Sequence, residues 1–230
     1  ALGTIREALD RYGREHVAFS FNGGKDCTVL LALMHEAGLL PTRRDVASMA
    51  PSAPAVSSSL TPRSGPSSAS YPPLRCLYVT PEHPFPEVES FVDACADEFP
   101  LDVRRINGSM KACLAEYMAA YPEARAILIG TRRTDPFASH LTAFSMTDPS
   151  WPQIMRVQPI LDWSYAEIWA FLQSRQTPFC ALYASGYTSL GGIDNTVPNP
   201  ALRISVRGLA SRQFRPAWEL EDEHLERAGR

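Results

Sequence analysis

Apolar residues follow two spacings along the chain, and these spacings succeed one another in a regular order. Runs of strand length, either wholly apolar or alternating, occur at 17–21, 75–80, 101–106, 124–130 and 154–161. Between them, apolar side chains recur every three or four residues, as on one face of a helix, over 28–38 and from residues 86, 110 and 164. The amino end, 1–13, also reads as an amphipathic helix. The segment at Ser164 opens with Ser-Tyr-Ala-Glu, a capping box that predicts where a helix begins.

Strands that alternate with helices of about 10 to 15 residues predict an α/β fold, with a mostly parallel twisted sheet and helices on both faces, a Rossmann-like arrangement. In such sheets, ligands bind beyond the carboxyl ends of the strands. The places to look for a site therefore follow Phe21, Thr80, Ile129 and Leu161. Past Pro178 the periodicity fades, and we expect residues 185–230 to form ordered, irregular loops that close over a site and end in a short polar helix.

One segment, 41–73, interrupts this pattern. It holds seven prolines and nine serines among 33 residues, with only four charges. Such a composition buries too little apolar surface to offset the entropy of ordering the chain. We expect a disordered insertion, and its removal joins the β-α unit ending near Leu40 to the run at 75–80. The prediction is a single domain, 1–230, with a surface insertion.

Composition narrows the classes of function. Apolar residues make up 45% of the chain and charged residues 20%, which is typical of a folded globular protein. The 22 Lys and Arg against 25 Asp and Glu give a net charge of −3, without the basic surplus of a nucleic-acid binder or a polybasic membrane protein. No apolar run approaches the roughly 20 residues that cross a membrane. We therefore expect no nucleic-acid or membrane partner, and any site for an anion must be local.

The five cysteines have the spacing of neither a disulfide framework nor a zinc site. Their number is odd and no C-x-x-C pair occurs; they are Cys27, Cys76, Cys95, Cys113 and Cys180. Reduced thiols in a cytosol-like compartment fit this pattern best. We accordingly expect a cytoplasmic protein.

The strongest local motif follows the first predicted strand. Ser-Phe-Asn-Gly-Gly-Lys-Asp-Cys, residues 20–27, runs directly into a helix. Two adjacent glycines let backbone N–H groups approach an anion at the positive end of the helix, and Lys25 adds a full charge. This pattern predicts a phosphate cradle that differs from the G-x-x-x-x-G-K-[ST] and G-x-G-x-x-G loops. A glycine turn with a solvated Lys-Asp pair is the alternative.

This loop resembles the pyrophosphate loop of the adenine-nucleotide alpha-hydrolase-like superfamily, which includes the phosphoadenosine phosphosulfate reductases. The chain is most similar to its FAD synthase (FMN adenylyltransferase) branch in eukaryotes. Further matching motifs occur in order at 130–136 (GTRRTDP), 148–160 (DPSWPQIMRVQPI), 187–191 (YTSLG), 195–202 (NTVPNPAL) and 215–220 (RPAWEL), and in the terminal ERAGR. The likeness covers nearly the whole chain outside the insertion. Many members of the wider superfamily carry Ser or Thr where this chain has Cys27, which leaves a hydroxyl contact to phosphate there in doubt.

The resemblance implies transfer of the adenylyl group of ATP to the phosphate of FMN, which gives FAD and pyrophosphate. It implies catalytic roles for Asn22, Asp26, Asp135, Arg227 and Arg230, and ATP-binding roles for Ser20, Phe21, Gly23, Gly24, Lys25, Arg132 and Arg156. It also places the Asp135 carboxylate near Mg²⁺. On the residues alone, Asp135 could be a turn aspartate before proline and the terminal arginines a solvated face. Because chain ends bury little, we expect removal of 226–230 to lower the rate far more than the stability.

The implied reaction can be set against what its chemistry needs. A phosphate monoester is mostly ionised near neutral pH, since its second pKa lies near 6, so the attack requires no general base. The difficulty is repulsion between two anions and the charge on the departing pyrophosphate, which calls for Mg²⁺, cationic side chains and backbone donors. The arginines that follow the predicted strands and end the chain suit this need.

A flavin needs a flat apolar slot with a few polar contacts. The resemblance places Asp148 and Trp151 beside the flavin ring, where the carboxylate could accept from a ring N–H. The alternative is an Asp-Pro turn followed by a surface tryptophan. Phe21, Phe137 and Trp163 are further aromatic candidates, for which we favour a core role. The implied partners are the small-molecule substrates ATP and FMN, together with apo-flavoproteins that receive the product.

Two other functions stay open at this point. A phosphoadenosine phosphosulfate reductase uses a carboxyl-terminal cysteine in an E-C-G-x-H context, whereas the last cysteine here, Cys180, lies in P-F-C-A-L. A flavin- or nucleotide-binding protein without catalysis would not need cations that converge on a phosphorus atom. Adenylyl transfer therefore agrees best with the sequence.

Overall fold

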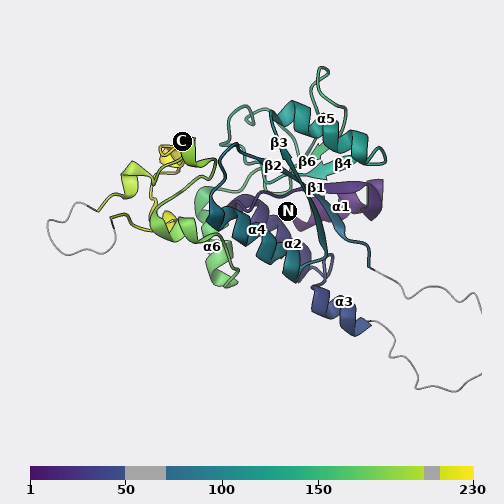
Figure 1. Ribbon diagram of the computed structural model, residues 1–230, viewed down its shortest axis with the longest axis horizontal. Coiled ribbons are helices and arrows are strands. Elements are labelled where there is room, and N and C mark those ends of the chain that lie inside the picture. Colours follow the sequence, from purple (N-terminus) through teal and green to yellow (C-terminus); the bar gives the residue numbers. More distant parts are fainter. Residues whose placement is uncertain (50–70, 205–212) are drawn as a thin grey trace, which may run out of the picture.

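The computed structural model describes residues 1–49, 71–204 and 213–230, which form one six-stranded sheet covered by helices (Figure 1). The strands are β1 (Val17–Ser20), β2 (Leu74–Thr80), β3 (Leu101–Asn107), β4 (Ala126–Leu128), β5 (Phe144–Met146) and β6 (Met155–Val157). Their order is β3-β2-β1-β4-β6-β5. All neighbours are parallel except β5 and β6, which run antiparallel. The mostly parallel sheet confirms the predicted fold class.

Apart from the helix at 43–49, the α-helices fall where the apolar spacing predicts them. They are α1 (Leu2–Tyr12), α2 (Lys25–Glu36), α3 (Arg43–Met49), α4 (Pro86–Glu98), α5 (Met110–Ala120) and α6 (Tyr165–Ser174). The capping box at the start of α6 is present, with Ser164 accepting from the backbone of Glu167 and the Glu167 carboxylate accepting from the backbone of Ser164. Proline occupies the first turn of α4, where its missing N–H is no loss.

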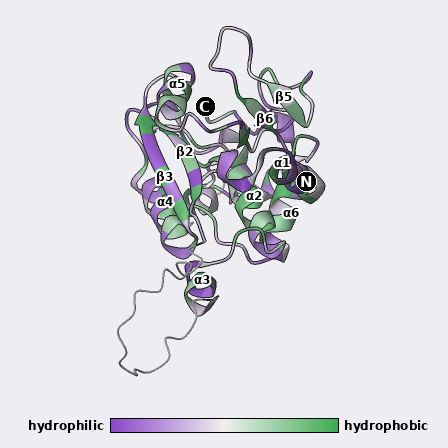
Figure 2. Ribbon diagram, turned by 90° about the vertical axis from the view of Figure 1, so that its right-hand side faces the viewer, coloured by the Kyte–Doolittle hydropathy of each residue, from purple (hydrophilic) through white to green (hydrophobic). Residues whose placement is uncertain are grey.

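The two faces of the sheet carry unequal cores. Alternation in β1 sends Val17 and Phe19 to the larger core, which contains α1, α2, α4 and α6, and sends Ala18 to the smaller core beside α5. Figure 1 shows α5 on one side of the sheet and α2, α4 and α6 on the other. Apolar residues concentrate in the inner strands and the inward faces of the helices (Figure 2). The apolar runs of the sequence thus become a core with helices on both faces.

The order in which strands are added to the sheet reverses at β1. The chain goes from β1 to β2 and β3 on one side, then returns through α5 to β4 on the other side of β1. Such a switch point opens a crevice beyond the carboxyl ends of the two central strands. The loops after Ser20 and Leu128 therefore diverge at the place where a ligand is expected.

The structure differs from the prediction in three places. Residues 43–49 of the segment predicted as disordered form helix α3, which lies beside α4, and residues 50–70 lie outside the described residues. Strand β5 was not predicted, because three residues at a sheet edge show no alternation that could identify them. The carboxyl end forms short 3₁₀ turns at Ala217–Glu219 and Glu223–Leu225 rather than the expected polar helix.

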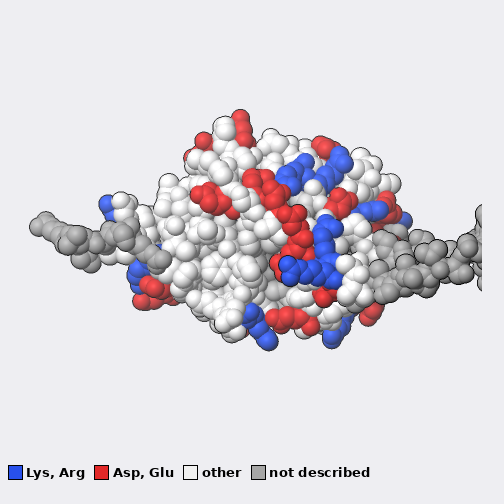
Figure 3. Space-filling view, turned by 60° about the horizontal axis from the view of Figure 1, so that its bottom comes forward, with Lys and Arg blue, Asp and Glu red and all other residues white. Residues whose placement is uncertain are grey.

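The described surface has no broad field of one charge on the side seen in Figure 3, where basic and acidic side chains stand next to one another. Oppositely charged side chains also pair directly, as Arg105 does with Glu89 and Asp93 of α4. None of the helices in the described ranges combines the length and the apolar character that a bilayer crossing needs.

Candidate active site

The loop between β1 and α2 has the geometry of an anion cradle. Gly24 is the N-cap of α2, and the Asn22 side chain accepts hydrogen bonds from the Gly24 N–H at 3.0 Å and from the Cys27 thiol at 3.1 Å. Gly23 has φ = 70°, and a Cβ at this position would lie 3.0 Å from Val92 of α4. Glycine is therefore required both for the turn and for the close packing against α4.

A cavity of about 330 Å³ opens beyond this loop, between the carboxyl ends of β1 and β4. Its wall comes from the loop, the segment after β4 and the carboxyl-terminal tail, and includes Asn22, Gly24, Lys25, Asp26, Asp135, Tyr183, Ser189, Arg227 and Arg230. Gly130 allows the segment after β4 to pass the start of α2, since a Cβ there would lie 2.9 Å from the Cys27 nitrogen. We refer to this space as the central cavity.

Four charged side chains form a cluster at the base of the central cavity, and three of them, Lys25, Asp26 and Glu226, also line its wall. The Lys25 Nζ lies 2.5 Å from Glu226 Oε1 and 3.0 Å from Asp26 Oδ2. The Arg132 guanidinium pairs with the second oxygen of Glu226, and its Nε lies 2.8 Å from Asp26 Oδ1. The Lys25 and Arg132 side chains are 3% and 1% exposed, and those of Asp26 and Glu226 are 23% and 11% exposed. The two cations are therefore neutralised almost out of contact with water by two carboxylates that are only partly exposed.

The cluster keeps its cations charged. Burial alone lowers the pKa of Lys25, but the carboxylates of Asp26 and Glu226 outweigh it and raise the pKa above its ordinary value. The pKa of Arg132 is also raised, because the same two carboxylates more than offset desolvation. The cluster therefore holds fixed charges at the base of the cavity at any physiological pH.

Two arginines of the tail face the cavity. Arg227 Nη2 lies 3.6 Å from Asp135 Oδ1, and the other oxygen of Asp135 accepts from the backbone N–H of Arg132 at 2.9 Å. Arg230 donates to the carbonyl oxygen of Leu190. Burial, with a smaller contribution from the charge of Arg227, lowers the pKa of Arg230. Two guanidinium groups beside one cavity repel each other unless an anion binds between them.

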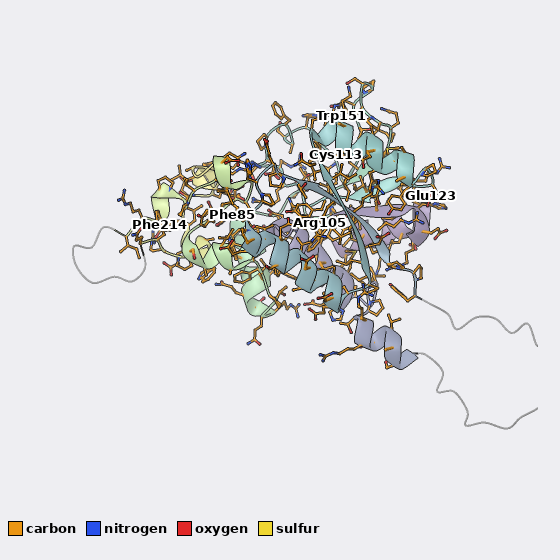
Figure 4. The ribbon with its side chains drawn as sticks, in the orientation of Figure 1. Phe85, Arg105, Cys113, Glu123, Trp151 and Phe214 are labelled. Carbon is orange, nitrogen blue, oxygen red and sulfur yellow. The ribbon has the colours of Figure 1, made fainter. Side chains whose placement is uncertain are left out.

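An apolar slot of about 240 Å³ adjoins the central cavity and shares Ser20, Met110, Ile129 and Thr131 with it. Trp151 and Asp148 line its far end, and Figure 4 shows Trp151 on the same side of the sheet as α5. Arg156 lines the slot as well, with its Nη2 4.0 Å from Asp148 Oδ1. The slot has the apolar walls and the polar edge that a flat ring requires.

A second cavity of about 240 Å³ adjoins the central one on the other side, beyond β2. It shares Asn22, Leu190 and Arg230 with the central cavity and is bordered by Thr80, Pro81, Gly191 and Gly192. Three neighbouring spaces thus lie along the carboxyl edge of the sheet, and the one with the anion-cradle loop is in the middle.

The structure brings together most of the residues that the sequence predicted, with three differences. Phe21 is fully buried in the larger core against Phe19, so its side chain does not reach the cavity. The Arg132 guanidinium lies in the buried cluster and not on the cavity wall. Arg156 lies with Asp148 and Trp151 in the slot, not with the loop that precedes α2. Of the other aromatic candidates, Phe137 is 91% exposed and not in the core.

Two residues of the site were missed. Tyr183 and Glu226 both line the central cavity, and both contact the start of α2 from late in the chain. Neither belongs to a spacing that a single sequence can reveal, although Glu226 directly precedes the predicted Arg227. Glu226 also contradicts the expectation that the chain end buries little, since it is 8% exposed.

The part of the chain that the structure describes contains no cluster of three His, Cys, Asp or Glu side chains placed to hold a metal ion. A cation that needs a complete protein cage does not fit this site. Mg²⁺ is compatible, because it binds through one or two carboxylates together with substrate phosphates and water. Asp135, at the cavity wall, supplies such a carboxylate.

Comparisons with known proteins agree with this geometry. Residues 108–198 match the family of the phosphoadenosine phosphosulfate reductase domain. The chain is 38% identical over 230 residues to a Schizosaccharomyces pombe protein named "Probable FAD synthase", covering all of this chain and 77% of that protein. It is 36% identical over 227 residues to a Caenorhabditis elegans protein of the same name, covering 98% of this chain but only 38% of that longer protein.

A solved structure is also similar over the whole chain. The Candida glabrata FMN adenylyltransferase, crystallised with FMN and the ATP analogue AMPCPP, superposes with a TM-score of 0.78 and 27% sequence identity. The match covers 100% of this chain and 88% of that one.

Proposed function

Because the chain belongs to the FAD synthase family, we infer that it transfers the adenylyl group of ATP to the phosphate of FMN, which gives FAD and releases pyrophosphate. One observation supports this function above the others. The loop at the start of α2, Asp135 and the two tail arginines share one cavity, and the slot that contains Trp151 shares four wall residues with it. A site of this form holds two phosphates and a flat ring together.

The reaction forms a bond between a phosphate oxygen of FMN and the α-phosphorus of ATP, and it breaks the bond from that phosphorus to the departing pyrophosphate. The attacking phosphate is already an anion near neutral pH. The chain therefore contributes by positioning the two substrates and by compensating the negative charge that builds on the phosphorus and the leaving group.

We assign the triphosphate of ATP to the central cavity. Ser20, Asn22, Gly23 and Gly24 lead to the positive end of α2, where backbone N–H groups bind phosphate oxygens. The Asn22 amide nitrogen is the side-chain donor that we place at the α-phosphate, since the Asn22 oxygen already accepts from Gly24 and Cys27. Lys25, Asp26 and Arg132 act from beneath, as the buried cluster that fixes the loop.

Arg227 and Arg230 are the groups that we assign to the charge of the transition state. Both line the cavity and both are cationic, and Arg227 lies close to Asp135. Repulsion between the two guanidinium groups is relieved when pyrophosphate forms between them.

We propose that Mg²⁺ takes part and that Asp135 binds it. One oxygen of Asp135 is held by the Arg132 N–H, and the other faces Arg227 at 3.6 Å, close enough to the cavity for a phosphate-bound cation. When bound, Mg²⁺ supplies charge neutralisation for the phosphates. The described residues contain no group of three His, Cys, Asp or Glu side chains that could hold it, so its remaining ligands are assigned to ATP oxygens and water.

The flavin ring is assigned to the apolar slot, beside Trp151 and with Asp148 at its polar edge. Arg156 is assigned to the same substrate, since it lines this slot. The cavity beyond β2 remains for the adenine of ATP, which places the two rings on opposite sides of the reacting phosphates.

We further propose that the protein works in the cytoplasm and passes its product to apo-flavoproteins.

The test is a direct assay of adenylyl transfer. The chain is supplied with ATP, Mg²⁺ and FMN, and FAD and pyrophosphate are followed by chromatography. Riboflavin in place of FMN is the control, because it lacks the nucleophilic phosphate. Formation of FAD with FMN but no product with riboflavin supports the proposal. Bound nucleotide without formation of FAD would identify a non-catalytic binding protein.

The reductase alternative conflicts with the state of its only candidate thiol. Cys180 has no exposed surface, and burial raises the pKa of its thiol. A nucleophilic cysteine needs the opposite, an accessible group with a lowered pKa. Adenylyl transfer predicts that Cys180→Ser keeps activity, and a reductase would lose it.

A further inference from the structure

Glu226 connects three segments that are far apart in the sequence. Its carboxylate bonds to Lys25, the first residue of α2, and to Arg132, which follows β4. Its own segment is the carboxyl-terminal tail. The two carboxylate oxygens are divided between the two cations, so a single side chain of the tail is bonded both to the start of α2 and to the segment after β4.

The backbone at Glu226 is fixed as firmly as its side chain. The Thr188 hydroxyl donates to the Glu226 carbonyl oxygen at 2.6 Å, and Asn199 donates to the preceding carbonyl of Leu225 at 2.7 Å. Asn199 and Thr188 are themselves hydrogen-bonded and buried. The tail therefore enters the buried cluster at one defined register.

This register determines where Arg227 lies. Glu226 pairs with the Arg132 side chain, while the next residue, Arg227, lies 3.6 Å from Asp135, whose other oxygen accepts from the Arg132 backbone. The tail and the segment after β4 thus contact each other through two successive tail residues, Glu226 and Arg227. Because the two residues are adjacent in the chain, a shift of Glu226 also moves Arg227, and a displacement of about 1 Å at a reacting centre can cost roughly 10²-fold in rate.

We propose that Glu226 is a positioning residue for adenylyl transfer: it joins Lys25 to Arg132 and thereby holds Arg227 at the reacting phosphates. This role rests on the proposed function. Glu226 acts through its neighbours and need not touch either substrate. The cluster has no spare carboxylate to replace it, since Asp26 already contacts both cations.

The test compares Glu226→Gln with Glu223→Gln. The glutamine at 226 keeps the size of the side chain but removes the charge that holds the two cations. Glu223 is a matched control, because it lies on the same tail and accepts from the Tyr165 N–H at 3.0 Å but contacts neither Lys25 nor Arg132. For Glu226→Gln, kcat is expected to fall roughly 10²-fold, with the KM for FMN within about twofold of wild type. Glu223→Gln is expected to keep kcat within about twofold.

Assays at a temperature where the variants are folded distinguish the positioning role from a role in stability alone. Both variants are assayed where circular dichroism shows that each is folded, and a Glu226→Gln protein that is folded yet has wild-type kcat overturns the proposal. Amide hydrogen exchange over 222–230 gives a readout besides turnover, and exchange should be faster in Glu226→Gln alone. Unchanged exchange in that variant also overturns the proposal. Failure of the wild type to form FAD would instead reject the proposed function, and the exchange data would then decide whether Glu226 anchors the tail.

Discussion

The hydroxyl of Tyr183 accepts a 2.8 Å hydrogen bond from the backbone N–H of Lys25, the first residue of α2. The first N–H groups of a helix have no partner within the helix, and in a phosphate site some of them bind the anion. Here one of these N–H groups already donates to a buried side chain that lies 158 positions away in the sequence. Tyr183 therefore fixes the direction in which α2 presents its remaining donors.

Replacing Tyr183 by phenylalanine should destabilise the protein by about 1–3 kcal/mol, because the buried Lys25 N–H loses its partner. Urea unfolding measures the loss. Tyr121→Phe is the control, since its hydroxyl bonds to Asp102 at 3.2 Å on the exposed surface and its removal should cost less. Equal stability of wild type and Tyr183→Phe would mean that water or the loop itself satisfies this N–H.

Much of the fold could be predicted because it depends on local spacing. The strand at 17–20, the helices that begin at Pro86, Met110 and Tyr165, and the parallel arrangement all follow from patterns within short windows. The burial of Phe21 follows from the same rule, since alternation places Phe19 and Phe21 on one face, and it confirms the core role favoured for Phe21 over the ATP-binding role that the resemblance implied.

The rest depends on contacts between distant segments. Glu226 and Lys25 lie 201 positions apart, and no spacing in one sequence connects them. Arg132 shows the same limit, because its motif predicted a cation at the nucleotide, whereas Glu226 and Asp26 draw its guanidinium beneath the cavity. A motif identifies which residues gather at a site, but their partners decide which way each side chain points.

The five cysteines should react slowly in the folded protein. All are buried, and burial raises the pKa of Cys27 and of Cys95 to about 12 and raises the pKa of the other three as well. At pH 8 the folded chain therefore holds almost no thiolate. Reaction with a chromogenic disulfide should be slow in buffer and complete in denaturant, and rapid modification of one native thiol would revive the reductase alternative.

The same pKa shifts predict a loss of stability in alkali. An unfolded chain releases its thiol protons near pH 8.5, whereas the folded chain keeps them on Cys27 and Cys95 until about pH 12. Above about pH 9 the folded state binds more protons than the unfolded state, so the free energy of unfolding falls as pH rises. Replacement of both cysteines by alanine should flatten this dependence, measured by urea unfolding from pH 8 to pH 11.

Asp135→Asn should nearly abolish turnover while FMN still binds. The amide oxygen can keep the bond to the Arg132 N–H, so the local turn survives, but the charge proposed to bind Mg²⁺ is lost. The expected fall in kcat is at least about 10²-fold, and added Mg²⁺ should not restore it. Asp162→Asn, which alters an exposed carboxylate paired with Arg133, should leave kcat unchanged. Full activity in Asp135→Asn would remove this residue from the metal site.

Trp151→Ala should weaken FMN binding selectively. If the indole stacks on the flavin as proposed, its loss costs about 1–3 kcal/mol, or roughly 5- to 150-fold in the KM for FMN, while the KM for ATP should change little. Trp163→Ala is the matched control, since Trp163 packs against Phe171 and lines neither the slot nor the central cavity. It should lower stability without raising the KM for FMN. An equal rise in both KM values for Trp151→Ala would place the flavin elsewhere.

Removal of the tail and replacement of one tail arginine should differ in their effect on stability. Arg227 is 46% exposed and its ion pair with Asp135 is long, so Arg227→Gln should change the free energy of unfolding by less than about 1 kcal/mol while lowering kcat by roughly 10²- to 10³-fold.

Deletion of 226–230 also removes the Glu226 carboxylate and leaves the buried Lys25 and Arg132 with Asp26 alone. Breaking a buried charge pair costs about 3–5 kcal/mol, so the truncated chain should lose stability as well as activity. This prediction replaces the expectation that removal of 226–230 lowers the rate far more than the stability. Urea unfolding and kcat, measured for both variants, show whether truncation lowers the stability as well as the rate. Equal stability of the truncated and full-length chains would mean that the buried cluster does not need its tail carboxylate.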